Sequence, residues 1–217
     1  FLAGSMITVS APAFGLPADL EMPKLTDVMP NSLTWVVMVI IIGGVTTWIA
    51  AKGYGMVSKV ANWMAPIIVL AFLACGLVAA KQLEIKSFSE FFSVWGEGSE
   101  PFPGQMKYTF WHVFLWSWFC NAAMHIGMSD LSVFRYARSS LSGWTTAAGM
   151  YVGHYIAWIA ACLLYAVYLK SPEAATFLAE GTAPPVAPGP LAFNAIGWFG
   201  IIAVILAGWT TANPTIY

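Results

Sequence analysis

Long apolar segments alternate with shorter polar ones along this chain. Five of the apolar segments approach the roughly 20 residues that an α-helix needs to cross a bilayer; they cover residues 32–51, 60–80, 108–128, 143–169 and 191–213. Each is longer than a barrel strand, which needs about 9–11 residues, and none alternates polar with apolar positions. The pattern therefore predicts an all-α integral membrane protein that forms a single helical bundle.

The ends of the chain suggest that this bundle is incomplete. Residues 1–15 are apolar, lack a charged start followed by a cleavage site, and are interpreted as the end of a preceding span. The last apolar segment runs directly into Thr210, Thr211, Asn213 and Pro214 before the chain stops at Tyr217. We therefore expect that the chain is cut from a longer protein.

The amino-acid composition indicates that most of the protein's surface contacts lipid rather than water. Hydrophobic residues make up 59% of the chain and charged residues 9%, with a mean hydropathy of +0.73. A soluble domain carries about 25% charged residues. The net charge of −1 gives no electrostatic basis for binding nucleic acid. The three cysteines lie in separate apolar segments, a spacing that fits neither a disulfide framework nor a zinc site.

Charged residues predict how the spans are oriented. Loops 52–59 and 129–142 carry one acid, Asp130, and four bases: Lys52, Lys59, Arg135 and Arg138. The stretches 16–31, 81–107 and 170–190 carry nine acids against five bases. Since basic loops stay in the cytoplasm, we expect loops 52–59 and 129–142 to be cytoplasmic and the protein to lie in the plasma membrane.

The segment 108–128 carries a polar stripe. Ser117, Asn121 and His125 recur every four residues, so they share one face of a helix, and Trp118 neighbours Asn121. Polar groups inside a span are costly unless they face protein or water. The stripe predicts a substrate pocket with an aromatic wall; the alternative is hydrogen bonding to a neighbouring helix. His125 is interpreted either as a coupling residue in a proton relay or as an interfacial histidine.

Of two other spans, one contains a predicted hinge and the other a predicted cation site. Pro66 lies inside segment 60–80, where it removes one backbone hydrogen bond and predicts a kink or hinge. In the last span, the Ala207 carbonyl and the hydroxyls of Thr210 and Thr211 fall on one side. These oxygens suit sodium, a hard cation. The alternative is that the threonine hydroxyls bond back to carbonyls of their own helix.

Three stretches resemble the nucleobase:cation symporter-1 family of cytosine and purine permeases and hydantoin transporters. They are GYGMVSKVANWMAP (53–66), SDLSVFRYAR (129–138) and AGWTTANP (207–214). The resemblance implies the leucine-transporter fold with its inverted repeats, of which the five spans would be helices four to eight. It also implies that Ala207, Thr210 and Thr211 match the sodium-site positions of the family.

The chain departs from the family pattern at two positions. The stacking tryptophan of the family falls at Asn121, and Trp118 lies nearly one turn earlier. The motif TTANP is one residue longer than the family form, which leaves Asn213 as the candidate for the asparagine that contacts substrate. An amide at position 121 would bind by hydrogen bonding rather than by stacking.

These observations predict a secondary active transporter that carries a nucleobase or related small heterocycle together with sodium by alternating access. Pro66 and His125 would serve gating or coupling; the expected substrate-binding residues are Ser117, Trp118, Asn121 and Asn213. An amino-acid or vitamin-precursor permease of the same fold, or a permease of that fold driven by protons, is the first alternative. A structural membrane subunit is a second. An enzyme is disfavoured because the spans contain no carboxylate and no Cys/His cluster, so we expect no catalytic residue and no cofactor beyond the transported cation.

Overall fold

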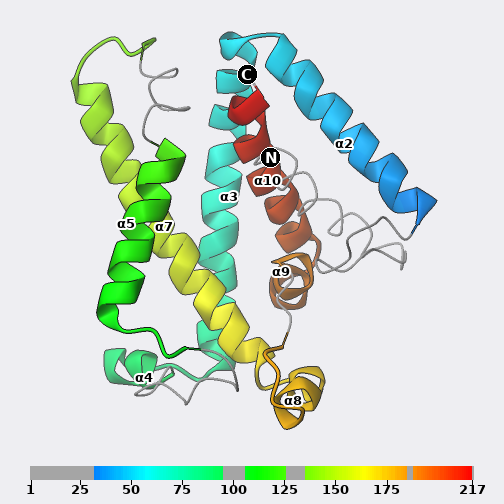
Figure 1. The fold of residues 1–217 in the computed structure, drawn as a ribbon, viewed down its shortest axis with the longest axis vertical. Helices are drawn as coiled ribbons and strands as arrows, with labels where there is room; N and C mark the ends of the chain where they lie inside the picture. Colours follow the sequence, from blue (N-terminus) through cyan, green and yellow to red (C-terminus); the bar gives the residue numbers. More distant parts are fainter. Residues whose placement is uncertain (1–31, 95–105, 126–134, 185–187, 217) are drawn as a thin grey trace.

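The regular elements of this chain are helices. The computed structural model describes residues 32–94, 106–125, 135–184 and 188–216, and it describes only the backbone of 120–125, 211 and 213–216. No strand occurs in these ranges, which confirms the prediction of an all-α chain. Figure 1 shows the described helices, which are α2 (Leu33–Ala51), α3 (Tyr54–Gln82), α4 (Phe88–Ser93), α5 (Phe110–His125), α7 (Leu141–Tyr168), α8 (Pro172–Ala179), α9 (Pro188–Ile196) and α10 (Trp198–Ile216).

Three of these helices are long and apolar enough to cross a membrane. They are α2 with 19 residues, α3 with 29 and α7 with 28, and they confirm the spans predicted at 32–51, 60–80 and 143–169. Helix α3 begins earlier than expected, so the loop predicted at 52–59 shrinks to a turn at Lys52 and Gly53. Gly53 has a φ of +85°, a left-handed value that glycine adopts at little cost.

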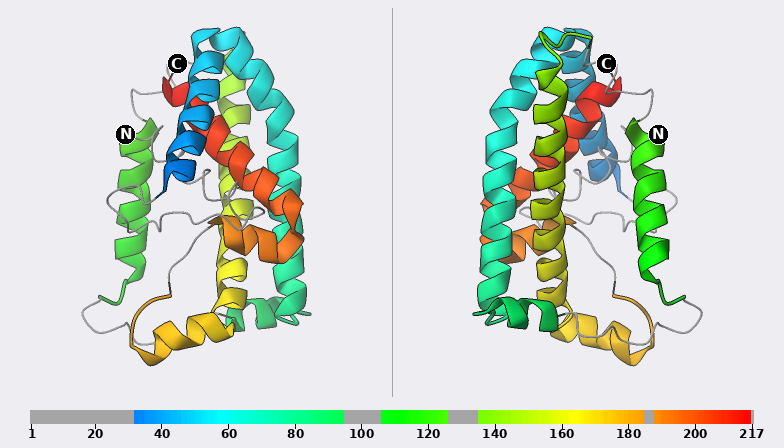
Figure 2. Two further views of the ribbon diagram at one scale, coloured as in Figure 1. Left: turned by 90° about the vertical axis from the view of Figure 1, so that its right-hand side faces the viewer. Right: turned by 90° about the vertical axis from the view of Figure 1, so that its left-hand side faces the viewer.

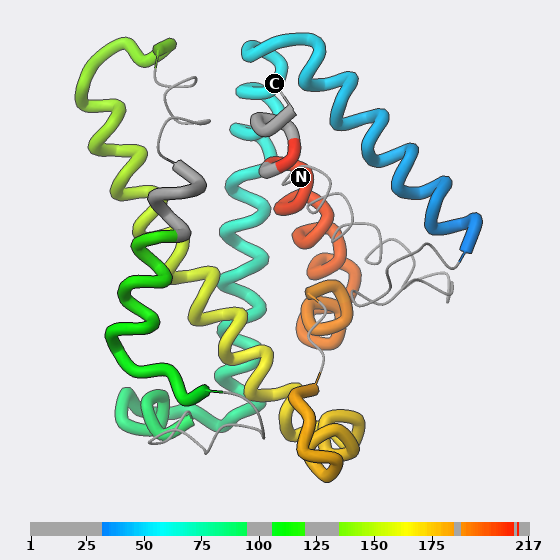
Figure 3. The backbone as a smooth tube through the Cα atoms, viewed as in Figure 1, coloured from blue at the N-terminus to red at the C-terminus, as the bar shows by residue number. Residues whose placement is uncertain are grey.

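The other two predicted spans are not described as single helices of membrane length. Within 108–128, the described helix is α5, which has 16 residues. The span predicted at 191–213 is broken at Gly197 into α9 and α10, which meet at a corner (Figure 3). Gly197 has a φ of +61°, and its N–H bonds to the Phe193 carbonyl at 2.7 Å, which ends α9. Hydropathy is continuous across this point, so it gave no sign of the break.

Short helices occupy the polar connections. Ser87 and Glu90 form a capping box at the start of α4, and the Ser171 hydroxyl accepts a hydrogen bond from the Ala174 N–H at the start of α8. Both short helices lie at the same end of the bundle in Figures 1 and 2. The described parts of the connections 81–107 and 170–190 therefore lie together, as expected, whereas 16–31 lies outside the described residues.

The opposite end holds the two basic loops. The turn between α2 and α3 and the segment that precedes α7 both lie there (Figure 1). The rings of Tyr54 and Tyr136 stack with their centroids 4.3 Å apart and join the two loops. The common side that charge predicted for loops 52–59 and 129–142 is thus present in the described residues.

The closest helix packing joins α3 to α7, and α10 packs across α3, α9 and α2. A Cβ added to Gly76 on α3 would lie 3.5 Å from the Ala160 Cβ on α7, so these backbones approach closely. Around this contact the small or apolar side chains of Cys75, Ala79 and Leu163 are buried. Most larger apolar side chains on α2, α5 and α7 are exposed, as expected for surfaces that meet lipid or other membrane segments.

Candidate substrate cavity and cation half-site

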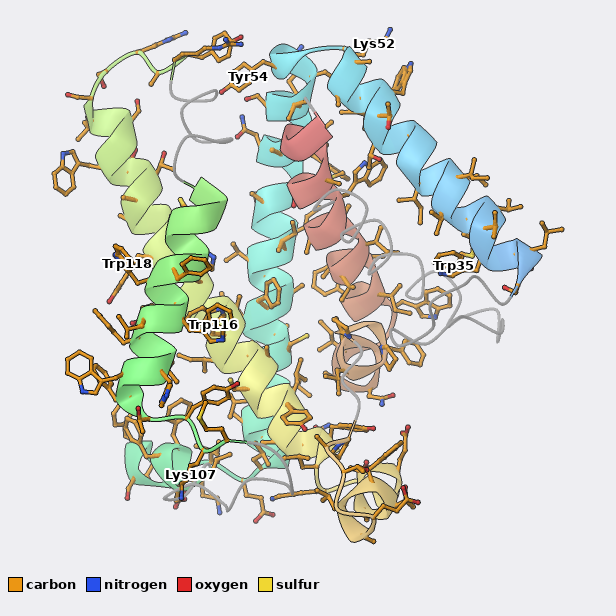
Figure 4. The ribbon with its side chains drawn as sticks, viewed as in Figure 1. Trp35, Lys52, Tyr54, Lys107, Trp116 and Trp118 are labelled. Atoms are coloured by element: carbon orange, nitrogen blue, oxygen red, sulfur yellow. The ribbon has the colours of Figure 1, made fainter. Side chains whose placement is uncertain are left out.

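A cavity of about 650 Å³, open to the surface, lies between α5 and α7, which are not a closely packed pair, and most of its lining side chains are exposed. One wall comes from α5 through Phe110, Val113, Phe114 and Ser117, which follow one another at helical spacing. The other wall comes from α7, whose lining residues repeat in the same way; they are Ala147, Met150, Tyr151, His154, Tyr155 and Trp158. Helix α5 stands apart from the other described helices in the side views (Figure 2), and Figure 4 shows its side chains.

Aromatic rings form most of the cavity walls. On α5 the rings of Phe110 and Phe114 stack with centroids 5.9 Å apart. On α7 the Tyr155 ring lies 4.8 Å from the Tyr151 ring and 6.5 Å from that of Trp158. Aromatic side chains spaced in this way offer flat faces to a bound ring.

A few polar groups interrupt these aromatic walls. The Tyr151 hydroxyl donates to the Tyr155 hydroxyl at 3.4 Å. His154 Nδ1 lies 2.9 Å from the Met150 carbonyl oxygen. A carbonyl can only accept, so Nδ1 carries the proton, and in the neutral ring Nε2 is then a hydrogen-bond acceptor. With Ser117 on the facing helix, the cavity combines apolar walls with a small number of orienting groups.

The residues predicted to bind substrate fall into separate places. Ser117 lines the cavity, whereas Trp118 is 67% exposed and does not belong to its described lining. The side chains of Asn121 and His125 lie outside the described residues, although the backbone of α5 reaches both. Asn213 is on α10, again with its side chain outside the described part, and no described residue of α10 lines the cavity.

The α7 wall was missed by the sequence reasoning, which gave His154 no role. The sequence did contain an indication of this wall. One face of this apolar helix carries polar and aromatic side chains at positions i, i+3, i+4 and i+7, which are Tyr151, His154, Tyr155 and Trp158. The stripe of Ser117, Asn121 and His125 in segment 108–128 was recognised from the same helical periodicity, so the one on α7 could have been found in the same way.

A second cavity of about 460 Å³ lies on another face of α5. It is lined by Tyr108, His112, Leu115, Trp116 and Phe119, all of which come from α5 or the residues just before it. His112 Nδ1 lies 2.8 Å from the Thr109 hydroxyl, a contact within the first turn. Since all its lining residues come from α5 or from the residues just before it, this hollow is a surface feature of one helix.

The predicted cation ligands lie on α10, where two of them are in contact. The Thr210 hydroxyl donates to the Ala207 carbonyl oxygen at 3.1 Å. This is the back-bonding alternative, formed to the third preceding residue. Oxygen ligands of a hard cation of calcium's size lie about 2.3–2.6 Å from the ion, so two oxygens this close can share one ion if the hydroxyl hydrogen turns away. The Thr211 side chain lies outside the described residues.

Pro66 lies within α3, which continues as one helix through it. Proline has no N–H, so the Asn62 carbonyl lacks its usual partner one turn earlier. Figure 2 shows that α3 is bent, with its N-terminal turns leaning away from the line of its C-terminal half. A bend of this kind is the expected effect of proline inside a helix.

Known proteins do not narrow the interpretation of these sites. Comparison of the chain with protein-family models, curated proteins and solved structures found no match. Within the described ranges, no group of three or more His, Cys, Asp or Glu side chains is placed to hold a metal ion. The functional interpretation therefore depends on the membrane-length helices, the cavity and the oxygens on α10.

Proposed function

We propose that this chain belongs to a secondary active transporter that moves a nucleobase or related small heterocycle together with sodium. In this proposal the protein is a member of the nucleobase:cation symporter-1 family, has the leucine-transporter fold and lies in the plasma membrane. The five predicted spans would be helices four to eight of that fold, with the basic loops in the cytoplasm. The observation that carries the proposal is the aromatic cavity between α5 and α7.

The size and chemistry of the cavity suit a small flat ligand. Binding sites for small molecules have volumes of about 300–1,000 Å³ and combine apolar walls with a few polar groups. The cavity between α5 and α7 has both properties, and one of its walls belongs to a helix of membrane-spanning length. Polar groups at membrane depth are costly, so a wall that combines a histidine with paired tyrosines supports a role in binding.

The packing of α3 supports coupling between cation and substrate. This helix packs against α7, which forms one cavity wall, and against α10, which carries Ala207 and Thr210. If cation binding shifts α10, α3 would therefore move with it and displace α7, which forms one wall of the cavity. The bend at Pro66 would act as a hinge in α3, and alternating access requires helices that rock or bend relative to one another.

The first alternative is a proton-coupled permease of the same fold. The presence of His154 in the cavity wall favours it, because histidine is the side chain whose charge changes near neutral pH. Sodium coupling predicts uptake that depends on external sodium, whereas proton coupling predicts uptake that depends on the pH gradient and is indifferent to sodium.

Radiotracer uptake tests the proposal. The protein that contains this chain is expressed in cells, and uptake of cytosine, uracil, hypoxanthine and hydantoin is compared with uptake of leucine, in sodium and in choline buffers. We expect saturable, sodium-stimulated uptake of at least one of the heterocycles. Uptake of leucine alone, or of none of the five compounds, would contradict the proposed substrate class.

A further inference from the structure

Positive charge gathers at one end of the bundle. The end formed by the α2–α3 turn, the first turns of α3 and the segment before α7 carries Lys52, Lys59, Arg135 and Arg138; the one acid of these loops, Asp130, lies outside the described residues. At the opposite end, the described residues include acids as well as bases, and these charges offset one another; the acids there are Glu84, Glu90, Glu173 and Glu180.

Aromatic contacts unite the two loops that carry these charges. Tyr54 at the start of α3 stacks on Tyr136. The Arg135 guanidinium lies 4.8 Å from the centre of the Tyr136 ring and donates to the Tyr136 hydroxyl at 2.8 Å. The two loops, which are about 80 residues apart in sequence, are thus held together at the same end of the bundle.

This basic surface lies at the ends of helices that are long and apolar enough to cross a membrane. Helix α2 ends there, and α3 and α7 begin there (Figure 4). The Lys52 ammonium lies 5.3 Å from the centre of the Trp48 ring, the position of a lysine that extends from an apolar helix toward the headgroups. Exposed Leu141 and Trp144 on the first turn of α7 add apolar surface just below.

We infer that this surface, which we call the basic end, binds the phosphate headgroups of anionic phospholipids. A headgroup phosphate would meet the basic residues, while its acyl chains would lie along the apolar side chains below them. Charge complementarity and position favour a lipid over a free phosphate ion, which would make no use of the apolar surface. Clusters of four or more basic residues next to spanning helices attract anionic lipids in this way. The inference does not depend on what the protein transports.

Spin-labelled lipids test the inference. The protein that contains this chain is reconstituted in phosphatidylcholine bilayers, and electron paramagnetic resonance measures the motionally restricted fraction of spin-labelled phosphatidylglycerol and of spin-labelled phosphatidylcholine. We expect the wild-type chain to prefer phosphatidylglycerol. Each basic residue near the surface contributes a factor of about five to such attraction, so the double variant Arg135→Gln/Arg138→Gln should lose most of the preference.

Two variants keep the test specific. The conservative change Arg135→Lys/Arg138→Lys retains the charge and should retain the preference. Lys81→Gln/Lys86→Gln removes the same charge at the opposite end and should leave the preference unchanged. Equal restriction of both lipids by the wild-type chain would overturn the inference. So would equal losses in Arg135→Gln/Arg138→Gln and Lys81→Gln/Lys86→Gln, and circular dichroism confirms that each variant remains helical.

Discussion

The contact between Gly76 and Ala160 gives the sharpest prediction about packing. A Cβ at position 76 would lie 3.5 Å from the Ala160 Cβ and 3.6 Å from its Cα, both ordinary van der Waals distances. Gly76→Ala should therefore fit, and it should be neutral or stabilising by up to about 1 kcal/mol because alanine favours helix over glycine. Gly76→Ile adds further carbon atoms that have no room, and overpacking of this kind costs about 1–3 kcal/mol.

Unfolding in detergent measures these differences. The chain is purified in dodecylmaltoside, and loss of helical circular dichroism is followed as sodium dodecyl sulfate is added. Gly44→Ile on α2 is the matched control, because nothing lies within 4 Å of a Cβ placed there. Equal stability of Gly76→Ile and Gly44→Ile would show that α3 and α7 do not pack through this contact.

Four further predictions concern the corner, the cation site and the cavity. Gly200→Ala should destabilise the chain far more than Gly149→Ala, since a Cβ at 200 overlaps the Ala192 carbonyl while a Cβ at 149 meets nothing within 4 Å; thermal unfolding in detergent compares the two. In uptake assays, Thr210→Val with Thr211→Val should abolish the sodium stimulation of transport without loss of folded protein. Unchanged sodium dependence would contradict the proposed sodium site on α10. Asn121→Leu should raise the apparent substrate constant at least tenfold if its amide bonds the substrate, about 1.4 kcal/mol; unaltered uptake would favour helix–helix bonding. His154→Phe keeps the size of the wall but removes its acceptor, so it should weaken uptake more than His112→Phe, whose position lies outside this cavity.

Hydropathy and charge predicted the membrane-length helices and the common side of the basic loops. A segment that spans a membrane must be apolar, and charged loops remain outside the hydrocarbon core. Apolar runs of the right length became α2, α3 and α7. The basic loops lie on a common side, since charge is costly to move across a membrane. The break at Gly197 was not predictable in this way, because hydropathy does not register a left-handed backbone angle.

The candidate site was predictable on one helix and missed on the other. A single polar stripe indicated Ser117, which does line a cavity, but the partner wall on α7 required knowing which helices lie face to face. On α10, spacing predicted that Ala207 and Thr210 would lie together. It left open whether the Thr210 hydroxyl faces a cation or bonds back to a carbonyl of its own helix, since that depends on the side-chain rotamer.

Substrate protection of a cysteine in the cavity tests the central claim most directly. The native cysteines are replaced, Ser117→Cys is introduced on the cavity wall, and Trp111→Cys provides a control on α5 that lies outside the cavity lining. Labelling by a membrane-permeant maleimide is timed with and without the heterocycles of the uptake panel. The account predicts that a transported heterocycle slows labelling at Ser117→Cys and leaves Trp111→Cys unchanged. Equal labelling rates at Ser117→Cys with and without every heterocycle would contradict it.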